Sequence, residues 1–366
     1  MIVERYKLVF LTVCFCLTPV VQAGPYTEAG INGFIDSDWR HADPDARINP
    51  IFRGWATGVE SYDPASPWDI DFLWMFPETA LGPVTGNYPE WDVVSLGDLD
   101  QQQIGQGVEP GSITLSFSEP EYIRNVKGYD FVVFENGHIA STNTDYGSIA
   151  GQMFSELGYV EVSSDGITFA RFPAVSLAPE PTAAPYHLLT IEISDMYNFA
   201  GKHPNAYGTC TGTGFDLSEL ADDPLVISGA VDVNSIRYVR IIDVPGSGDF
   251  FDEAQMHIDP NTGLAWDYYE SAHPIYDAWL TSYSGGFDLE AIGVLKEQQF
   301  SADINLDGIV DICDLNLFCS AWMSSFGDEN WIARCDLVEP KDLVIDMRDF
   351  AAFARQWRKI ENWRDQ

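Results

Sequence analysis

The stretch Asp303-Ile-Asn-Leu-Asp-Gly-Ile-Val-Asp-Ile-Cys-Asp314 decides how the end of this chain folds. It spaces oxygen-bearing residues through twelve positions around one glycine, Gly308, which suits a sharp turn. A hard cation such as Ca²⁺ takes about six to eight oxygen ligands, and this alternation can deliver them to one point. The sequence therefore predicts a calcium-binding loop. Its expected ligands are Asp303, Asn305, Asp307, Ile309 through the backbone carbonyl, Asp311 and Asp314.

A second copy of this unit follows 35 residues later, and its first half differs from the first copy. Leu343 stands in the place of the glycine, and Val338 and Pro340 stand where positions 1 and 3 would fall. A loop that begins at Asp336 and is two residues longer restores the number of ligands. The alternative is an acidic, solvated turn that binds no cation. The second set of ligands would be Asp336, Glu339, Asp342, Val344 through the backbone carbonyl, Asp346 and Asp349.

Both loops lead into segments with the apolar spacing of a helix. Apolar side chains recur at i, i+3, i+4 and i+7, which gives each helix one apolar stripe. A single loop–helix unit cannot bury its stripe, so the repeat predicts two units packed face to face. The two stripes are Leu315, Phe318, Cys319 and Trp322, and Phe350, Phe353, Ala354 and Trp357.

The repeat pair resembles a type I dockerin, the calcium-dependent docking module of secreted bacterial proteins, over residues 301–358. The first loop follows the EF-hand spacing, with Asp314 in place of the usual glutamate. The resemblance implies that Ca²⁺ folds the module and that a cohesin-like protein is its partner. In dockerins the residues at loop positions 10 and 11 are the main ones that recognise the cohesin partner. Here those positions lack the usual small hydroxyl pair and are Ile312 with Cys313, and Met347 with Arg348.

The N-terminus has the pattern of a secretory signal over residues 1–23. Arg5 and Lys7 precede an apolar run that ends at the small-residue site Val21–Ala23. No later apolar run is long enough to span a bilayer, so no transmembrane segment is expected. The sequence therefore predicts a secreted, extracellular protein associated with the cell surface.

Composition narrows the class of protein further. The chain carries 56 acidic and 19 basic residues and a formal charge of −37, so it lacks the clustered Lys and Arg of a nucleic-acid-binding surface. Hydrophobic residues make up 46% of the sequence, which is typical of a folded protein. In an exported protein a disulfide between two of Cys313, Cys319 and Cys335 is expected, and the sequence does not choose the pair.

Short strand-like runs separated by Gly- and Asp-rich turns dominate the region before the repeat. They favour a mainly β fold, an antiparallel β-sandwich over residues 91–298. Ser164–Gly166 predicts a hairpin turn between two of the runs. Residues 24–90 show little periodicity, and we expect an irregular segment packed on the sandwich. The predicted strands are residues 92–96, 112–117, 129–134, 159–163, 167–172, 236–242 and 286–295.

Several of these runs resemble the jelly-roll domain of exported bacterial cell-surface proteins. They are V-S-L-G-D at 94–98, G-Y-D-F-V-V-F-E-N-G at 128–137 and Y-V-E-V-S-S-D-G at 159–166. With R-Y-V-R-I at 237–241 they are also similar to galactose-binding-like sandwiches, over about residues 90–296. The resemblance implies a jelly-roll-like fold. Such folds host lectins, carbohydrate-binding modules of glycosidases and structural domains, so carbohydrate is one expected ligand.

The sequence contains no nucleophile elbow, zinc-protease motif or Gly-rich phosphate loop. A glycoside hydrolase needs only two placed carboxylates, and the many acidic residues leave that alternative open. Some acidic and amide residues follow predicted strands or lie among glycines, where they could form a ligand or calcium site in the sandwich. The alternative for those after residue 242 is an acidic surface loop. The candidates are Glu135, Asn136, Asp243, Asp249 and Asp252.

These patterns together predict an exported, non-catalytic protein with a β-sandwich binding or structural domain and a calcium-dependent docking module. One alternative is a secreted glycoside hydrolase or other polysaccharide-degrading enzyme that carries a dockerin. Another is a lectin-like carbohydrate-binding protein. The expected organisation is a signal peptide at 1–23, an irregular segment at 24–90, the sandwich at 91–298, the dockerin-like module at 299–358 and a tail at 359–366.

Overall fold

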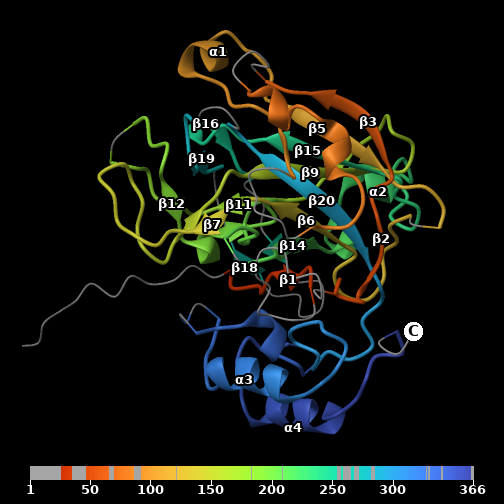
Figure 1. Cartoon of the computed structure of the whole chain (residues 1–366). Helices are drawn as coiled ribbons and strands as arrows, with labels where there is room; N and C mark the ends of the chain where they lie inside the picture. Colours follow the sequence, from red (N-terminus) through yellow and green to blue (C-terminus); the bar gives the residue numbers. More distant parts are fainter. Residues whose placement is uncertain are drawn as a thin grey trace, which may run out of the picture.

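The computed structural model is mainly β, with antiparallel sheets and few helices among the described residues (Figure 1). We call residues 26–298 the β-domain and residues 299–363 the C-terminal module. The predicted secretory signal and Glu339 lie outside the described residues. The described ranges are 26–34, 47–65, 70–85, 92–120, 122–182, 184–207, 209–253, 257–258, 265–267, 272–281, 285–326, 328, 330–338 and 341–363.

Two antiparallel sheets form the body of the β-domain. The larger has the strand order β1-β14-β6-β20-β2, with β4 also paired to β20, and the other has the order β10-β9-β15-β5-β3. The strands of the larger sheet are β1 (Ile31–Asn32), β14 (Thr211–Phe215), β6 (Phe131–Glu135), β20 (Asp288–Leu295), β2 (Phe52–Trp55) and β4 (Val94–Ser95). Those of the other sheet are β10 (Ala170–Arg171), β9 (Gly158–Ser163), β15 (Tyr238–Asp243), β5 (Ser112–Ser116) and β3 (Gly58–Asp63).

One apolar core joins the two sheets. The larger sheet contributes the rings of Phe131 and Phe215, which stack with their centroids 5.2 Å apart. The other sheet contributes alternate residues: Val239 and Ile241 of β15 are buried, whereas Arg240 between them is not. Side chains of a strand point alternately to its two faces, so this pattern buries one face of the sheet.

The predicted hairpin is confirmed, because β9 and β10 pair antiparallel with Ala170 opposite Val162. The expectation that residues 24–90 are irregular is wrong. This segment supplies β1, β2 and β3, and the last two pair with β20 and β5. The strand pattern is hidden in the sequence because register shifts interrupt both pairings, between Phe52 and Gly54 and between Val59 and Ser61.

Smaller sheets and short helices complete the described part of the β-domain. The strands are β7 (His138–Ile139), β8 (Met153–Phe154), β11 (Val175–Ser176), β12 (Thr190–Ile191), β13 (Met196–Tyr197), β16 (Ser247–Phe251), β17 (His257–Ile258), β18 (Ala265–Asp267) and β19 (Pro274–Tyr276). The helices are α1 (Gln101–Gly105) and α2 (Pro224–Ile227), with 3₁₀ turns η1 (Phe72–Trp74), η2 (Pro77–Ala80), η3 (Ile193–Asp195) and η4 (Leu217–Leu220).

The C-terminal module lies below the β-domain in Figure 1 and contains helices α3 (Ile312–Ser320) and α4 (Met347–Gln356), with the turn η5 (Ala333–Cys335) between them. Phe318 and Phe353 are buried, with ring centroids 5.4 Å apart, so α3 and α4 contact each other through these two rings. The apolar stripes are narrower than expected, because four of the predicted stripe residues are exposed: Cys319, Phe350, Ala354 and Trp357. No helix in the described part of the chain has the length and apolar character needed to cross a bilayer.

Candidate metal centre

The first predicted loop, residues 303–314, turns around the side chain of Asp303. Its Oδ2 accepts a hydrogen bond from the Gly308 N–H at 2.9 Å, and its Oδ1 accepts one from the Asp307 N–H at 3.1 Å. Gly308 has φ 88°, a left-handed conformation that favours glycine. The main chain therefore folds back on the first predicted ligand, as a cation-binding loop requires.

Asp314, the last predicted ligand of this loop, ties its beginning to α3. Its Oδ1 accepts hydrogen bonds from the N–H groups of Ile304 and Asn305 at 2.7 and 3.1 Å, and its Oδ2 accepts one from the Asp311 N–H at 2.8 Å. Asp311 caps the helix, because its Oδ1 accepts from the Cys313 N–H at 2.8 Å. This reciprocal capping box couples the order of the loop to the first turn of α3.

The middle of the loop brings the remaining predicted ligands to the same turn. The Asn305 Oδ1 accepts from the Asp307 N–H at 3.2 Å, and the Asp307 Oδ1 accepts from the Ile309 N–H at 2.9 Å. Ile309 forms an isolated bridge with Ile360, whose hydrogen bonds run through the residues on either side of it. The Ile309 carbonyl is therefore outside that ladder, where it can serve as a main-chain ligand.

Burial raises the pKa of both buried carboxyls in this loop. The pKa of Asp303 is raised to about 7, by burial first and then by the charge of Asp314, while Arg334 acts in the opposite direction. The pKa of Asp314 is raised to about 6, again mainly by burial. Two carboxylates that are costly to ionise together favour a neighbouring cation, because the cation stabilises their charged forms.

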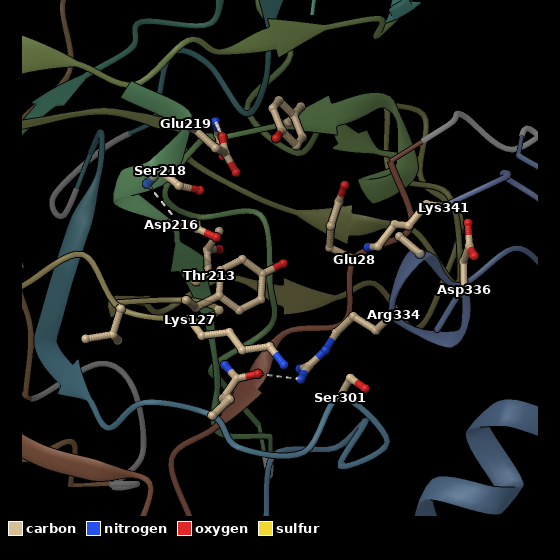
Figure 2. Close-up of a pocket in the computed structure, with 18 of the residues that line it drawn as sticks. Glu28, Lys127, Thr213, Asp216, Ser218, Glu219, Ser301, Arg334, Asp336 and Lys341 are labelled. Carbon is tan, nitrogen blue, oxygen red and sulfur yellow. Dashed lines mark hydrogen bonds between the residues drawn. The ribbon is translucent and has the colours of Figure 1, made fainter. Parts of the chain in front are cut away.

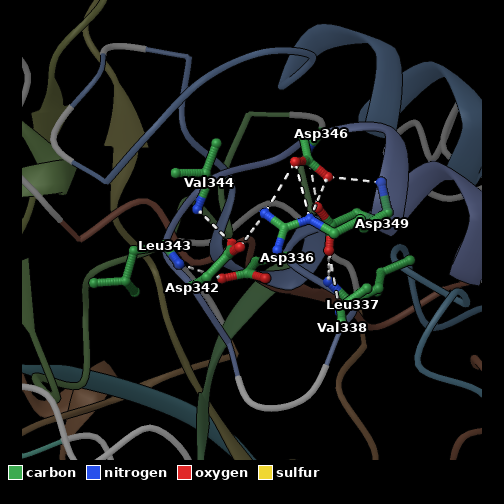
Figure 3. A network of polar contacts seen from close by, with 9 residues as sticks. Asp336, Leu337, Val338, Asp342, Leu343, Val344, Asp346 and Asp349 are labelled. Atoms are coloured by element: carbon green, nitrogen blue, oxygen red, sulfur yellow. Dashed lines mark hydrogen bonds and ion pairs between the residues drawn. The ribbon is translucent and has the colours of Figure 1, made fainter.

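The second loop repeats the hydrogen-bond pattern with Asp336 in the place of Asp303 (Figure 3). The Asp336 Oδ2 accepts from the Leu343 N–H at 3.0 Å. The Asp349 Oδ1 accepts from the N–H groups of the two residues after Asp336, at 2.8 and 3.0 Å. These contacts start the loop at Asp336, two residues earlier than direct register with the first loop. Asp346 caps α4 and forms a capping box with Asp349, as in α3.

Leu343 replaces the turn glycine and keeps its left-handed conformation, with φ 61°. A side chain there is strained, since the left-handed region crowds its Cβ atom. Its side chain packs against the core of the module, which offsets that strain. Next to it, the Asp342 Oδ1 accepts from the Val344 N–H at 3.2 Å, and Val344 bridges to Ser325 as Ile309 does to Ile360. The middle of the two loops is therefore built alike.

Arg348 distinguishes the second loop from the first. Its guanidinium forms ion pairs with both Asp342 and Asp346, the latter at 3.0 Å. Its hydrogen bonds hold the pKa of Asp346 below its usual range. The residue at the same position of the first loop is Cys313. A guanidinium beside two predicted ligands supplies positive charge from the chain itself, a role that the spacing of acidic residues did not predict.

The donor chemistry of both loops fits a hard cation, since carboxylate, amide and main-chain oxygens surround each turn. The Asp336 Oδ1 is also buried without a hydrogen-bond partner. Among the described residues no three His, Cys, Asp or Glu side chains are grouped as a finished metal centre. Loop N–H groups and Arg348 engage the carboxylate oxygens, so a cation would have to replace some of these bonds in order to bind.

The first loop is anchored in the β-domain. Leu306 is fully buried in an apolar cluster that includes Ile51, Phe134 and Leu295 of the β-domain. The Asn49 side chain donates from Nδ2 to the Leu306 carbonyl at 3.3 Å. The module and the β-domain therefore share part of one core, so the module does not stand free of the β-domain as a tethered unit would.

A groove of about 520 Å³ lies between the β-domain and the C-terminal module (Figure 2). Its walls carry both signs of charge. Glu28 and Glu219 come from the β-domain, and Arg334 and Lys341 come from the C-terminal module. Burial raises the pKa of Glu219 to about 8. Asp336 also lines this groove, so the second loop borders it.

The structure separates the five sandwich candidates into two places. Glu135, Asn136 and Asp243 lie at the ends of β6 and β15, and the Asn136 Nδ2 donates to Asp288 at 3.0 Å. Asp249 instead accepts from Gln101 at 2.8 Å. Asp252 is buried and accepts from the His273 ring at 2.8 Å and from the Ser176 N–H at 2.9 Å. Asp249 and Asp252 therefore take part in contacts between distant segments of the chain and do not join the first three.

The expected disulfide is not formed. Cys313, Cys319 and Cys335 are free thiols, and the first two are exposed on α3 whereas Cys335 is buried in the core of the module. The helix holds Cys313 and Cys319 on its outer surface, away from the core that contains Cys335.

No protein-family model matches the chain, and no curated protein matches it.

Proposed function

We propose that this chain is an exported, non-catalytic protein whose C-terminal module is a dockerin-like pair of calcium-binding repeats that docks to a cohesin-like protein partner. Its β-domain would be a jelly-roll-like binding or structural domain. The shared hydrogen-bond pattern of the two loops carries the proposal. In each loop the first carboxylate accepts the N–H at the turn, and the last carboxylate accepts two N–H groups near the start. Two loops of different length with the same contacts favour a common ligand.

When bound, Ca²⁺ supplies the positive charge that Asp303 and Asp314 otherwise lack. The chain does the rest: Gly308 and the Asp307 N–H orient Asp303, and Asp314 links the start of the loop to the cap of α3. Order in the loop is thereby passed to the helix. Because a cation that binds only the folded loop stabilises it, calcium should order the N-terminal turn of α3.

Matched exposed side chains support the docking part of the proposal. Ile312 and Met347 are the first residues of α3 and α4, and they are 57% and 64% exposed. Both directly follow the aspartate that caps their helix, so order in each loop sets their position. Apolar side chains that stay exposed at equivalent positions are suited to a protein interface.

The test uses the full chain and a purified type I cohesin domain, with binding measured in CaCl₂ and in EDTA. We expect binding in calcium only, and a loss of about 30-fold or more in affinity for Ile312→Asp and Met347→Asp, as for interface hot spots. Met323→Asp is the matched control, since Met323 is 68% exposed and lies in the turn after α3. Binding that is equal in EDTA, or no binding at all, would overturn the proposed partner.

A further inference from the structure

Six of the acidic side chains that the β-domain buries by nine-tenths or more form a cluster far from the two loops in the sequence. They come from different elements that meet at one end of the sheets. Glu135 ends β6 and Asp288 begins β20, and these strands pair with Glu135 opposite Leu289. Asp243 ends β15. The full set, which we call the inner acidic cluster, is Asp98, Glu135, Glu156, Asp243, Asp277 and Asp288.

Backbone N–H groups hold several of these carboxylates by one oxygen. The Asp243 Oδ1 accepts from the Phe287 N–H at 2.7 Å, and the Asp277 Oδ2 accepts from the Leu157 N–H at 2.7 Å. The Glu135 Oε2 accepts from the N–H two residues further on, at 2.9 Å. These bonds fix where each carboxylate lies, since the donors belong to the main chain of neighbouring strands and loops.

The second oxygen of the same three carboxylates is buried and has no hydrogen-bond partner. These atoms are the Glu135 Oε1, the Asp243 Oδ2 and the Asp277 Oδ1. Leaving one buried acceptor unsatisfied costs about 1–3 kcal/mol, and more when the group is charged. Three such acceptors in one cluster point to a ligand that satisfies them together.

Thr281 ties two further members into the cluster. Its N–H donates to the Asp98 Oδ2 at 3.1 Å, and its hydroxyl donates to the Glu156 Oε1 at 2.6 Å. The same Oγ1 accepts from the Gly286 N–H at 3.1 Å, next to the start of β20. Asp98 and Glu156 are therefore held beside the strand end that carries Asp288.

The inner acidic cluster brings carboxyl groups together without a balancing positive charge on four of them among the described residues. Burial raises the pKa of Glu135, Glu156, Asp243 and Asp277, and the charges of other members raise it further. Among the described residues no Lys or Arg forms an ion pair with these four carboxyls. Buried carboxylates without a basic partner need either protons or a bound cation.

We propose that the inner acidic cluster binds a divalent cation of the calcium class, separate from the two C-terminal loops, through the open oxygens of Glu135, Asp243 and Asp277. The all-oxygen donor set suits a hard cation. As placed, no three of these carboxylates form a finished centre within the described part of the chain. The cation draws the open oxygens together while the backbone hydrogen bonds retain the other oxygens. One divalent ion offsets two charges, and the remaining carboxyls keep protons.

The alternative is that protons alone neutralise the cluster. The protonated and the cation-bound cluster differ in how an Asp→Asn substitution changes the thermal stability. If the carboxyls are only protonated, Asp→Asn removes the cost of protonating a buried carboxyl at neutral pH and raises the thermal stability whether calcium is present or not. If they bind a cation, Asp→Asn removes a ligand, and the stabilisation by calcium is lost. The sign of the change in Tm with calcium therefore separates the two explanations.

The experiment uses the full chain with the loops weakened by Asp307→Ala and Asp342→Ala, dialysed against EDTA and titrated with CaCl₂ by calorimetry. We expect at least one equivalent of calcium to remain in this background. Adding Asp243→Asn or Asp277→Asn should lower its affinity by tenfold or more and abolish the rise in Tm. Glu135→Gln serves where an aspartate variant does not fold. Asp249→Asn, outside the cluster, should leave binding unchanged.

The proposal is overturned if the loop-weakened chain binds no calcium, or if Asp243→Asn and Asp277→Asn bind calcium as before. A higher Tm in these variants without calcium, and no response to calcium in the background, would identify protons as the occupant. These outcomes do not depend on the partner of the C-terminal module, because the loops are weakened in every sample.

Discussion

The two C-terminal loops share one hydrogen-bond plan but differ in what surrounds it. The first loop has a glycine at its turn and Cys313 beside its acidic residues. Its Leu306 side chain is buried in the β-domain. The second has Leu343 at the turn, borders a groove and has Arg348 bridging two of its carboxylates. The second repeat therefore keeps the hydrogen bonds that fold the loop while the charges around the loop have changed. We therefore expect the first loop to bind calcium more tightly than the second.

The largest effect on stability should come from the anchor of the first loop. Leu306→Ala removes a fully buried leucine from the core shared with the β-domain, and we expect a loss of about 2–5 kcal/mol in the free energy of unfolding. Lys341 is the equivalent residue of the second loop and lines the groove. Lys341→Ala should change stability by less than about 0.5 kcal/mol. Equal losses of unfolding free energy for Leu306→Ala and Lys341→Ala in chemical denaturation would show that the first loop is no better anchored than the second.

The pH dependence in EDTA should show the buried carboxyls of the first loop. The folded pKa of Asp303 is raised to about 7, above its ordinary value of 3.8. Its contribution to stability is therefore full below about pH 4 and is lost as the pH rises to about 7, with an upper bound of about 4 kcal/mol. Asp303→Asn should flatten the decline measured by chemical denaturation between pH 4 and 8. A decline of unchanged slope would assign it to other groups.

Removing the guanidinium should make the second loop more like the first. Arg348→Ala frees Asp342 and Asp346 from their ion pairs, so we expect the calcium affinity of this loop to rise about tenfold, or about 1.4 kcal/mol. Cys313→Ala changes the equivalent position of the first loop and should have no such effect. Calorimetric titration of the two variants gives the comparison, and a fall in affinity for Arg348→Ala would mean that the arginine supports calcium binding.

The smallest expected effect concerns the turn of the first loop. Gly308→Ala places a Cβ atom at φ 88°, and we expect a loss of about 1 kcal/mol in the free energy of unfolding. Gly105→Ala is the control: this glycine lies in α1 with open space around its Cβ position, so alanine there should be neutral or stabilising. A neutral Gly308→Ala would show that the first loop tolerates a side chain as the second does.

Sequence periodicity predicted the helices and the register of the loops because both depend on local spacing. The position of Asp336 follows from counting ligands, and the hydrogen bonds of Asp349 have the same register. The strands before residue 90 escaped prediction because register shifts break their alternation. The sequence does not indicate that Leu306 is buried, because the residues that cover it belong to the β-domain. Long-range contacts of this kind have no signature in a single sequence.

The candidate sites divide in the same way. Glu135, Asn136 and Asp243 could be singled out because each lies at the end of a predicted strand. Glu156, Asp277 and Asp98 could not, since they are brought together only by long-range contacts: Thr281 binds Asp98 and Glu156, and the Leu157 N–H binds Asp277. The sequence predicts Arg348 as a docking residue. It does not predict the two ion pairs of Arg348, because these depend on the rotamer that the long side chain adopts in the fold.

Calcium binding by the repeat pair can be measured directly by calorimetric titration of the full chain, comparing the unaltered protein with Asp307→Ala and with Asp342→Ala. We expect the tightest C-terminal binding step to disappear with Asp307→Ala, and a weaker step to disappear with Asp342→Ala. Identical titration curves for the three proteins would contradict the central claim that the C-terminal repeat pair binds calcium.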